Sequence, residues 1–197
     1  MSKIIVFENV SLDGVIQDPT GEEGFNALDW RAGLTDADRE AWGKMILADA
    51  LDADALLLGR GGYEFFAQRY PSRTSALADR INGLPKYVVS STLTDPKWHG
   101  TTVLNGDALT EVERLKRTVD GEIRVYASAR LLSLLFAHDL VDELRLAVFP
   151  VLMGAGDRVF AQSEARKPLR PRLLRLVEAR AISENLLHLT HRRAAAR

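Results

Sequence analysis

The sequence predicts an α/β protein whose central sheet is mostly parallel and has an antiparallel edge. Along most of the 197 residues, short apolar runs typical of buried strands alternate with segments of helical periodicity. The chain then closes with two alternating segments in succession, residues 172–180 and 186–192, which predict a terminal antiparallel pair. Because this length suits one folding unit and no linker or repeat interrupts it, we expect a single domain over residues 1–197.

The first third of the chain predicts one strand, a long loop and one helix. The strand is expected at residues 4–9, where apolar and β-branched side chains cluster. Thr35, with Asp38 three residues later, forms a capping box that predicts the start of the helix. The apolar side chains of this helix lie mostly on one face: Trp42, Met45, Ile46, Leu47 and Ala50.

The remaining elements follow in the same alternation. An amphipathic helix is predicted at residues 109–119, with Val112, Leu115 and Val119 facing inward. The other helices are expected at residues 63–68, 74–81 and 129–137. The other strands are expected at residues 55–58, 86–90, 101–104, 123–127 and 144–149, the last stopped by Pro150.

Composition excludes several classes of function. The net charge of −1 creates no field that would attract nucleic acid or an anionic membrane, so neither is expected as a partner. No apolar segment is long enough to span a bilayer, and the N-terminal apolar run is too short for a signal peptide. The absence of cysteine excludes disulfides and thiolate chemistry and fits a cytoplasmic location.

Small and hydroxyl-bearing residues follow nearly every predicted strand. Ligands of open α/β sheets bind beyond the carboxyl ends of the strands, where small residues let a ligand approach the backbone. The segments at these ends are Ser11-Leu12-Asp13-Gly14, Gly59-Arg60-Gly61-Gly62, Ser90-Ser91-Thr92, Ala127-Ser128-Ala129 and Pro150 with Gly154. Their hydroxyl and N–H groups are typical donors to phosphate or ribose oxygens. Together they predict one ligand site along a shared edge of the sheet.

The segment Gly59-Arg60-Gly61-Gly62 is the most informative of these ends. A buried strand that opens through glycines into a helix leaves unpaired backbone N–H groups at the helix start, and these attract anions. Arg60 adds a charged planar fork of donors at the same point. A plain strand–helix turn with a solvated arginine is the alternative interpretation of this segment alone. The other strand ends favour a phosphate site.

The same motifs, in this order, resemble the dihydrofolate reductase-like family. Within it the chain is most similar to the reductase-type C-terminal domain of the bifunctional riboflavin-biosynthesis deaminase-reductase, as a stand-alone member. The matching segments are Ser11-Leu12-Asp13-Gly14, Leu58-Gly59-Arg60 with Tyr63, and residues 88–91, 140–146 and 149–160. The resemblance implies a three-layer α/β fold, an NADPH-dependent reductase activity and a homodimer.

The resemblance also implies roles for individual residues. Arg60 matches an arginine directed at the adenosine 2′-phosphate of NADPH, and Ser90, Ser91 and Thr92 match the loop that flanks it. Ser128 and Ala129 match a turn beneath the pyrophosphate. The implied cofactor-binding set is Gly59, Arg60, Gly61, Gly62, Ser90, Ser91, Thr92, Ala127, Ser128 and Ala129.

On the substrate side, the resemblance places Leu12 and Asp13 near the nicotinamide and assigns Pro150 and Gly154 to a substrate loop. Asp13 is the catalytic candidate, for substrate orientation or proton relay. Since Asp-Gly is also a common turn pair, a purely structural role for Asp13 stays open.

Two residues depart from the family pattern. Gly62 stands where the family usually has a threonine whose hydroxyl helps to hold the cofactor phosphates, and one missing hydrogen bond costs about 1–3 kcal/mol in affinity. Ala127 stands where the family usually has glycine. Its Cβ costs little if the backbone is extended, but crowds the pyrophosphate if φ is positive.

The expected function is hydride transfer from NADPH to a C=N or C=O group of a small heterocyclic or ribosyl-linked substrate. Dihydrofolate itself is not expected, because Trp30-Arg31-Ala32 offers no carboxylate where that substrate would need one. The sequence identifies neither the physiological substrate nor the proton donor. The alternative is a non-catalytic protein that binds a nucleotide or a flavin-like ligand on the same scaffold.

Other candidate residues are interpreted as structural. His188 and His191 are three apart on a predicted strand, so they face opposite ways, and no metal-ligand cluster is expected. Asp142 and Glu143 open a strand and are expected in solvent or at a subunit contact. Trp30 and Trp42 belong either to the core, which we favour, or to the wall of a pocket for a flat ligand.

Overall fold

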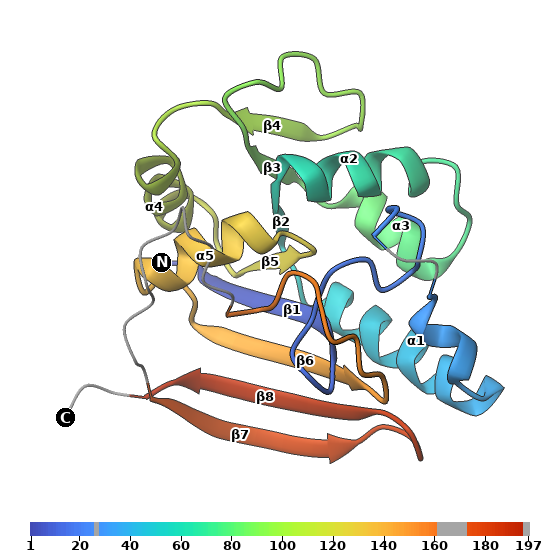
Figure 1. The fold of residues 1–197 in the computed structure, drawn as a ribbon. Coiled ribbons are helices and arrows are strands. Elements are labelled where there is room, and N and C mark those ends of the chain that lie inside the picture. The colour runs from blue at the N-terminus through green and yellow to red at the C-terminus, as the bar shows by residue number, and fades with distance from the viewer. Residues whose placement is uncertain (26–27, 161–172, 195–197) are drawn as a thin grey trace.

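A computed structural model describes residues 1–25, 28–160 and 173–194 and contains one eight-stranded sheet (Figure 1). The strand order is β4-β3-β2-β5-β1-β6-β8-β7. The strands are β1 (Lys3–Ser11), β2 (Ala55–Gly59), β3 (Lys86–Val89), β4 (Thr101–Leu104), β5 (Glu122–Tyr126), β6 (Glu143–Phe149), β7 (Leu174–Ala181) and β8 (Leu187–Arg193).

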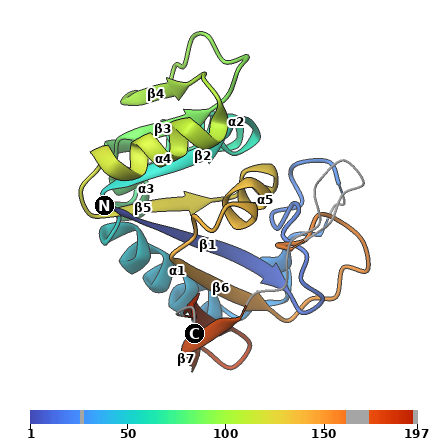
Figure 2. The ribbon, with the colours of Figure 1, turned by 90° about the vertical axis from the view of Figure 1, so that its left-hand side faces the viewer.

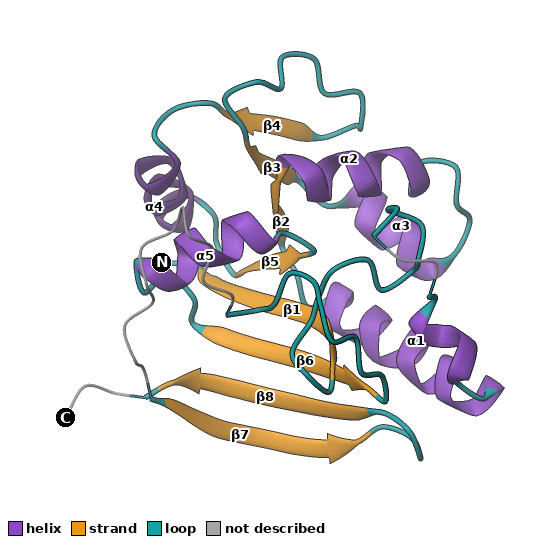
Figure 3. Ribbon diagram, viewed as in Figure 1, coloured by secondary structure: helices purple, strands orange, loops and turns teal. Residues whose placement is uncertain are grey.

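The first six strands are parallel to one another. β1 lies between β5 and β6 and pairs in parallel with both, so the first strand in sequence is central in space. β8 then pairs antiparallel with β6, and β7 pairs antiparallel with β8 at the edge of the sheet (Figure 3). The predicted mostly parallel sheet with an antiparallel C-terminal pair is therefore confirmed. Residue 172, where the first strand of that pair was expected to begin, lies outside the described residues.

Helices cover both faces of this sheet, which makes three layers (Figure 2). They are η1 (Trp30–Gly33), α1 (Asp36–Leu51), α2 (Arg60–Arg69), α3 (Ala76–Gly83), α4 (Ala108–Thr118) and α5 (Ala129–Ala137). One apolar core joins α4 and α5 to the sheet, and a second core joins α1, α2 and α3 to its other face. The predicted capping box of Thr35 and Asp38 is present at the start of α1.

Successive side chains of β1 point to opposite faces of the sheet, so each one packs into one of the two cores. Val6 and Val10 pack into the core beneath α4 and α5, whereas Phe7 packs into the core beneath α1. Since side chains alternate along a strand, Glu8 shares the face of Val6 and Val10. An acidic side chain is thereby placed at a position that otherwise holds apolar residues.

Helix α2 begins earlier than expected. Its first residue is Arg60 rather than residue 63, so Gly61 and Gly62 belong to its first turn instead of a loop. Gly59 is the N-cap residue and makes no side-chain capping hydrogen bond. The backbone amides of this turn are therefore carried by glycines, which let other groups approach closely.

Candidate ligand-binding site

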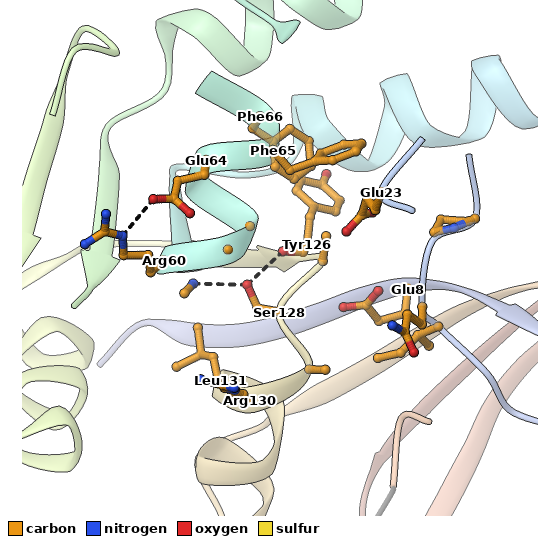
Figure 4. A pocket seen from close by; sticks show the side chains of 18 of the residues that line it. Glu8, Glu23, Arg60, Glu64, Phe65, Phe66, Tyr126, Ser128, Arg130 and Leu131 are labelled. Carbon is orange, nitrogen blue, oxygen red and sulfur yellow. Dashed lines mark hydrogen bonds and ion pairs between the residues drawn. The ribbon is translucent and has the colours of Figure 1, made fainter. Parts of the chain in front are cut away.

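A large cavity of about 1050 Å³ opens at the carboxyl ends of β2, β3 and β5, beside β1 (Figure 4). All ten residues predicted to bind a cofactor line it: Gly59, Arg60, Gly61, Gly62, Ser90, Ser91, Thr92, Ala127, Ser128 and Ala129. They come from three strand ends that are far apart in the sequence. The parallel order β3-β2-β5 brings those ends together at one edge.

Arg60 links two of these segments at the mouth of the cavity. Its Nε donates to Glu64 Oε1 at 2.8 Å, and its Nη1 donates to Thr92 Oγ1 at 2.6 Å. The side chain stays 42% exposed, so the guanidinium keeps a face toward the solvent side of the cavity. These two contacts hold a planar cation beside the hydroxyl groups that follow β3.

Ser128 connects the segment of Gly59 to the segment that follows β5. Its Oγ accepts from the N–H of Gly59 at 3.0 Å and donates to the carbonyl of Tyr126 at 3.3 Å. The hydroxyl therefore ties the start of α2 to the end of β5. Both α2 and α5 begin at the cavity wall, and the N-terminus of a helix favours negative charge.

Gly62 is explained by close packing against the turn after β5. A Cβ at this position would lie 2.3 Å from the carbonyl oxygen of Ala127 and 2.8 Å from Ser128 Oγ. No larger side chain fits unless the backbone of one segment moves. The threonine typical of the family is thus incompatible with this arrangement of α2 and the β5–α5 turn.

Ala127 adopts the conformation in which its Cβ is unfavourable. Its φ is +44°, in the left-handed region that glycine enters freely. For alanine this backbone costs about 1–2 kcal/mol. Of the two cases that the sequence left open, the structure therefore has the one with positive φ.

Glu8 lines the same cavity and was not predicted from the sequence. It is only 5% exposed, and burial raises the pKa of its carboxyl from 4.5 to about 8, although the backbone amides of Ser128 and Ala127 partly offset this. Its Oε1 has no hydrogen-bond partner within the described residues. The sequence does contain a signal for it: Glu8 lies in an apolar strand, at a position whose side chain points toward the core.

An aromatic wall forms the other side of the cavity. The ring of Phe66 lies 5.5 Å from that of Phe65, 5.1 Å from Tyr70 and 6.3 Å from Tyr126, and all four residues line the space. Trp42 also lines it and donates from Nε1 to Asn9 Oδ1 at 3.0 Å. Flat apolar walls of this kind suit a planar ring. Trp42 also packs against the core beneath α1, so it has both of the roles considered for it, whereas Trp30 is 1% exposed and belongs to the core as expected.

The hydroxyl of Tyr126 belongs to a buried network of charged side chains. Its hydroxyl donates to Asp49 Oδ2 at 2.7 Å, and burial, together with the Asp49 carboxylate, raises the tyrosine pKa well above its ordinary value. Asp49 also pairs with Arg124 at 3.0 Å and with Arg145 at 2.6 Å. Paired charges inside a protein have well-defined positions, so the network holds this part of the aromatic wall in place.

The predicted substrate-side residues form a separate cluster. The Asp13 carboxylate accepts from Ser11 Oγ at 2.7 Å and from the backbone amides of Met153 and Gly154 at 3.1 and 2.8 Å. These hydrogen bonds lower the pKa of Asp13 to about 2. The cavity wall, as far as the described residues go, does not include Leu12, Asp13, Pro150 or Gly154. The geometry of Asp13 matches the structural role, because it joins the loop after β1 to the loop after β6.

Two carboxylates expected in solvent or at a subunit contact are engaged within the chain. Asp142 accepts from the backbone amide of Ile4 at 2.8 Å and pairs with Lys116. Glu143 is 5% exposed and pairs with Arg145 and Arg192, each at 2.6 Å. Glu143 is therefore not in solvent, whereas the side chain of Asp142 stays 30% exposed, and a subunit contact of either residue stays a prediction.

Neither a metal site nor a membrane span emerges from the part of the chain that the structure describes. It holds no group of three potential metal ligands among its histidines, aspartates and glutamates. None of its helices combines the length and hydropathy needed to cross a bilayer.

The sheet with helices on both faces has the dihydrofolate reductase-like fold. Within that fold class, the chain belongs to the family of the RibD C-terminal domain, whose family model matches residues 2–188. This is a reductase-like family of riboflavin biosynthesis. The resemblance drawn from the sequence motifs is thus confirmed.

Individual relatives agree with this assignment. The uncharacterised protein YyaP of Bacillus subtilis (strain 168) is 26% identical over 194 residues, which cover 96% of this chain and 94% of YyaP. A protein of Shewanella sp. PV-4 ascribed to riboflavin biosynthesis superposes with a TM-score of 0.74 at 21% identity, covering 98% and 99% of the two chains. Dihydrofolate reductase of Enterococcus faecalis, solved with NADP(H) and RAB-propyl, has a TM-score of 0.59 at 14% identity, covering 97% and 96%.

Proposed function

We propose that this protein is an NADPH-dependent reductase that transfers hydride to a C=N or C=O group of a small heterocyclic or ribosyl-linked substrate. The observation that carries the proposal is the convergence of all ten expected cofactor-binding residues on one cavity. A solvated turn at Gly59 would not require Ser90 to Thr92 and Ala127 to Ala129 to line the same space. The cavity is also large enough for a ligand beyond the size of one small ring.

The residues present fit the cofactor in three respects. Arg60 and the hydroxyl of Thr92 offer donors for a phosphate at the cavity mouth. The starts of α2 and α5 offer backbone amides and favourable dipoles for a diphosphate. The aromatic wall of Phe65, Phe66 and Tyr126 offers a flat surface for a planar ring.

The chemistry would be divided between cofactor and protein. NADPH, when bound, supplies the hydride, as is general for reductases that use a nicotinamide. Arg60 would bind the 2′-phosphate and thereby select NADPH over NADH. The aromatic wall would orient the substrate ring and exclude water, while Asp13 would keep the loops after β1 and β6 in position through Gly154.

The alternative is a binding protein without turnover, and two residues favour it. Gly62 supplies no hydroxyl to a phosphate, and the Cβ of Ala127 stands in a turn of positive φ where the family usually has glycine. Both changes weaken the expected diphosphate site without closing the cavity. A nucleotide or flavin-like ligand would then be held on the same scaffold.

Fluorescence titration with NADPH and NADH tests the cofactor assignment. The wild-type protein is expected to bind NADPH more tightly, and Arg60→Ala is expected to remove that preference. Arg114→Ala is the control, because Arg114 lies on α4 and, like its partner Glu111, does not line the cavity. Failure of both dinucleotides to bind at sub-millimolar concentration would refute the reductase assignment.

Catalysis requires a second measurement once binding is established. NADPH oxidation is followed at saturating cofactor across a panel of heterocyclic and ribosyl-linked carbonyl and imine compounds. Turnover that depends on the added compound supports the reductase. Tight NADPH binding with no turnover by any compound favours the binding protein.

We also propose that the single domain works as a homodimer in the cytoplasm. Strand β7 lies at the sheet edge with its apolar side chains in solvent: Leu174 is 37%, Leu176 52% and Val177 39% exposed. An apolar edge strand of this kind is a ready surface for pairing. Light scattering is expected to give twice the chain mass, and Leu176→Glu is expected to give the monomer mass. Cell fractionation tests the location.

A further inference from the structure

Glu8 is an acidic side chain buried in the cavity wall. It projects from β1 on the face that carries α5, and Figure 4 shows its carboxyl beside the turn that holds Ser128. Only 5% of the residue is exposed. The carboxyl therefore belongs to the floor of the cavity, next to the first residues of α5.

One of its oxygens lacks any compensating contact. Oε1 is shielded from water, yet within the described residues it has no hydrogen-bond partner. An ionised carboxylate that is buried without a cation or a full set of donors is strongly disfavoured. The neutral acid form is favoured instead, in keeping with a pKa near 8, and a neutral carboxyl carries one O–H donor.

The charges around the cavity do not change this conclusion. They include Glu23 and Asp18 from the loop after β1, Arg60 and Glu64 from α2, Arg130 from α5, and Asp157. None of these side chains contributes to the shift in the Glu8 pKa, which results from burial and from the amides of Ser128 and Ala127. No cation of the described chain thus stabilises an ionised Glu8.

We propose that Glu8 is a neutral hydrogen-bond donor that binds an anionic oxygen of the ligand at the start of α5. Under the proposed function, on which this inference rests, that oxygen belongs to the diphosphate of NADPH. Ser128 donates its hydroxyl to the carbonyl of Tyr126, and Gly62 has no hydroxyl, so the turn is poor in side-chain donors. The O–H of Glu8 supplies a donor at the same place, and a bond from a neutral acid to a phosphate oxygen is charge-assisted.

Ligand affinity must then depend on the proton of Glu8. Loss of this proton removes the donor and places a second negative charge beside the ligand phosphate. Binding therefore retains one proton that the free protein releases at high pH. By linkage, the dissociation constant rises about tenfold for each pH unit above the Glu8 pKa.

Titrations over a range of pH test this proposal. Binding of NADPH and, separately, of ADP-ribose is measured between about pH 7 and about pH 9.5, around the pKa at which Glu8 ionises. ADP-ribose carries the diphosphate but no nicotinamide and no 2′-phosphate. The wild-type affinity for both is expected to fall with increasing pH, whereas Glu8→Gln, which keeps a neutral donor, is expected to bind both without that slope.

Two further variants separate the donor from its surroundings. Glu8→Leu removes the donor and is expected to bind both ligands more weakly at about pH 7 than Glu8→Gln does. Glu23→Gln changes another acid of the cavity wall and is expected to keep the wild-type slope. Infrared spectroscopy of the free wild-type protein is expected to show a protonated carboxyl band near neutral pH that Glu8→Gln lacks.

The outcomes separate this proposal from the proposed function. A slope for ADP-ribose that Glu8→Gln removes supports the role of Glu8 even if NADPH is never oxidised. Equal slopes in the wild type and Glu8→Gln overturn it even if NADPH is bound and oxidised. Absence of binding by either ligand, or of the protonated carboxyl band, also overturns it.

Discussion

The buried acid at position 8 predicts an unusual dependence of stability on pH. Its carboxyl has a pKa of about 8 in the folded protein, against 4.5 in the unfolded chain. The folded state therefore holds a proton that the unfolded state releases between these two pH values. Its contribution to stability is complete below about pH 4.5 and is lost progressively as the pH rises to about 8.

The size of the effect follows from the same two values. At about 1.4 kcal/mol per pH unit, moving a pKa from 4.5 to about 8 corresponds to about 5 kcal/mol of stability lost across that window. Glu8→Gln keeps the shape of the side chain but cannot ionise. We therefore expect the variant and the wild type to be similarly stable at about pH 4.5, and the variant to be more stable by several kcal/mol at about pH 8.

Urea denaturation at a series of pH values measures this difference in the free energy of unfolding. The dependence of that free energy on urea concentration is compared between the two proteins, to confirm that both expose the same surface area on unfolding. Asp13→Asn is a control for which the pH dependence of stability is expected to have the opposite sign. Hydrogen bonds lower the pKa of Asp13 to about 2, so its contribution is present above its ordinary pKa and is lost as the pH falls. A difference between Glu8→Gln and the wild type that does not change with pH would refute the reasoning.

Three substitutions and one control variant probe the packing around the cavity, each followed by urea denaturation. Gly62→Ala is expected to destabilise the fold by about 1–3 kcal/mol, because its Cβ would lie 2.3 Å from the Ala127 carbonyl oxygen. Gly61→Ala, whose Cβ would meet nothing within 4 Å, is the matched control and is expected to leave stability equal or higher. Ala127→Gly is expected to stabilise by up to about 1 kcal/mol, since it relieves the strain of φ +44°. Tyr126→Phe is expected to destabilise by about 1–3 kcal/mol, because Asp49 loses the 2.7 Å hydrogen bond that it accepts in the interior.

Much of the architecture could be predicted from local patterns. The alternation of apolar runs with helical segments predicted a mostly parallel sheet with a final antiparallel pair, and the Thr35–Asp38 box predicted the start of α1. The strand ends were recognisable because glycines, serines and Arg60 follow apolar runs. Each of these patterns involves residues only a few positions apart, so predicting them requires no knowledge of contacts between distant segments.

Other features depend on segments that the sequence does not relate. The fit of Gly62 depends on the turn at Ala127, and Ser128 Oγ accepts from Gly59 across 69 positions of the chain. Likewise, Asp142 pairs with Lys116, which lies on a helix far before it in the chain, and no local pattern indicates this contact. Such contacts depend on how strands and helices stack, which local periodicity leaves open.

By itself, therefore, the sequence determined the class of fold, the family and the small and hydroxyl-bearing residues at the strand ends around Arg60. Only the tertiary structure decided the backbone conformation, the burial and the cavity contacts of the residues at this edge of the sheet. In the folded protein Ala127 has a positive φ. Trp42 lines the cavity, whereas Asp13 does not. The tertiary structure also buried Glu8 with no hydrogen-bond partner for Oε1 among the described residues. The physical reason is that burial, which sets the charge state of an acid and the room beside a glycine, is a property of the packed layers and not of any local segment.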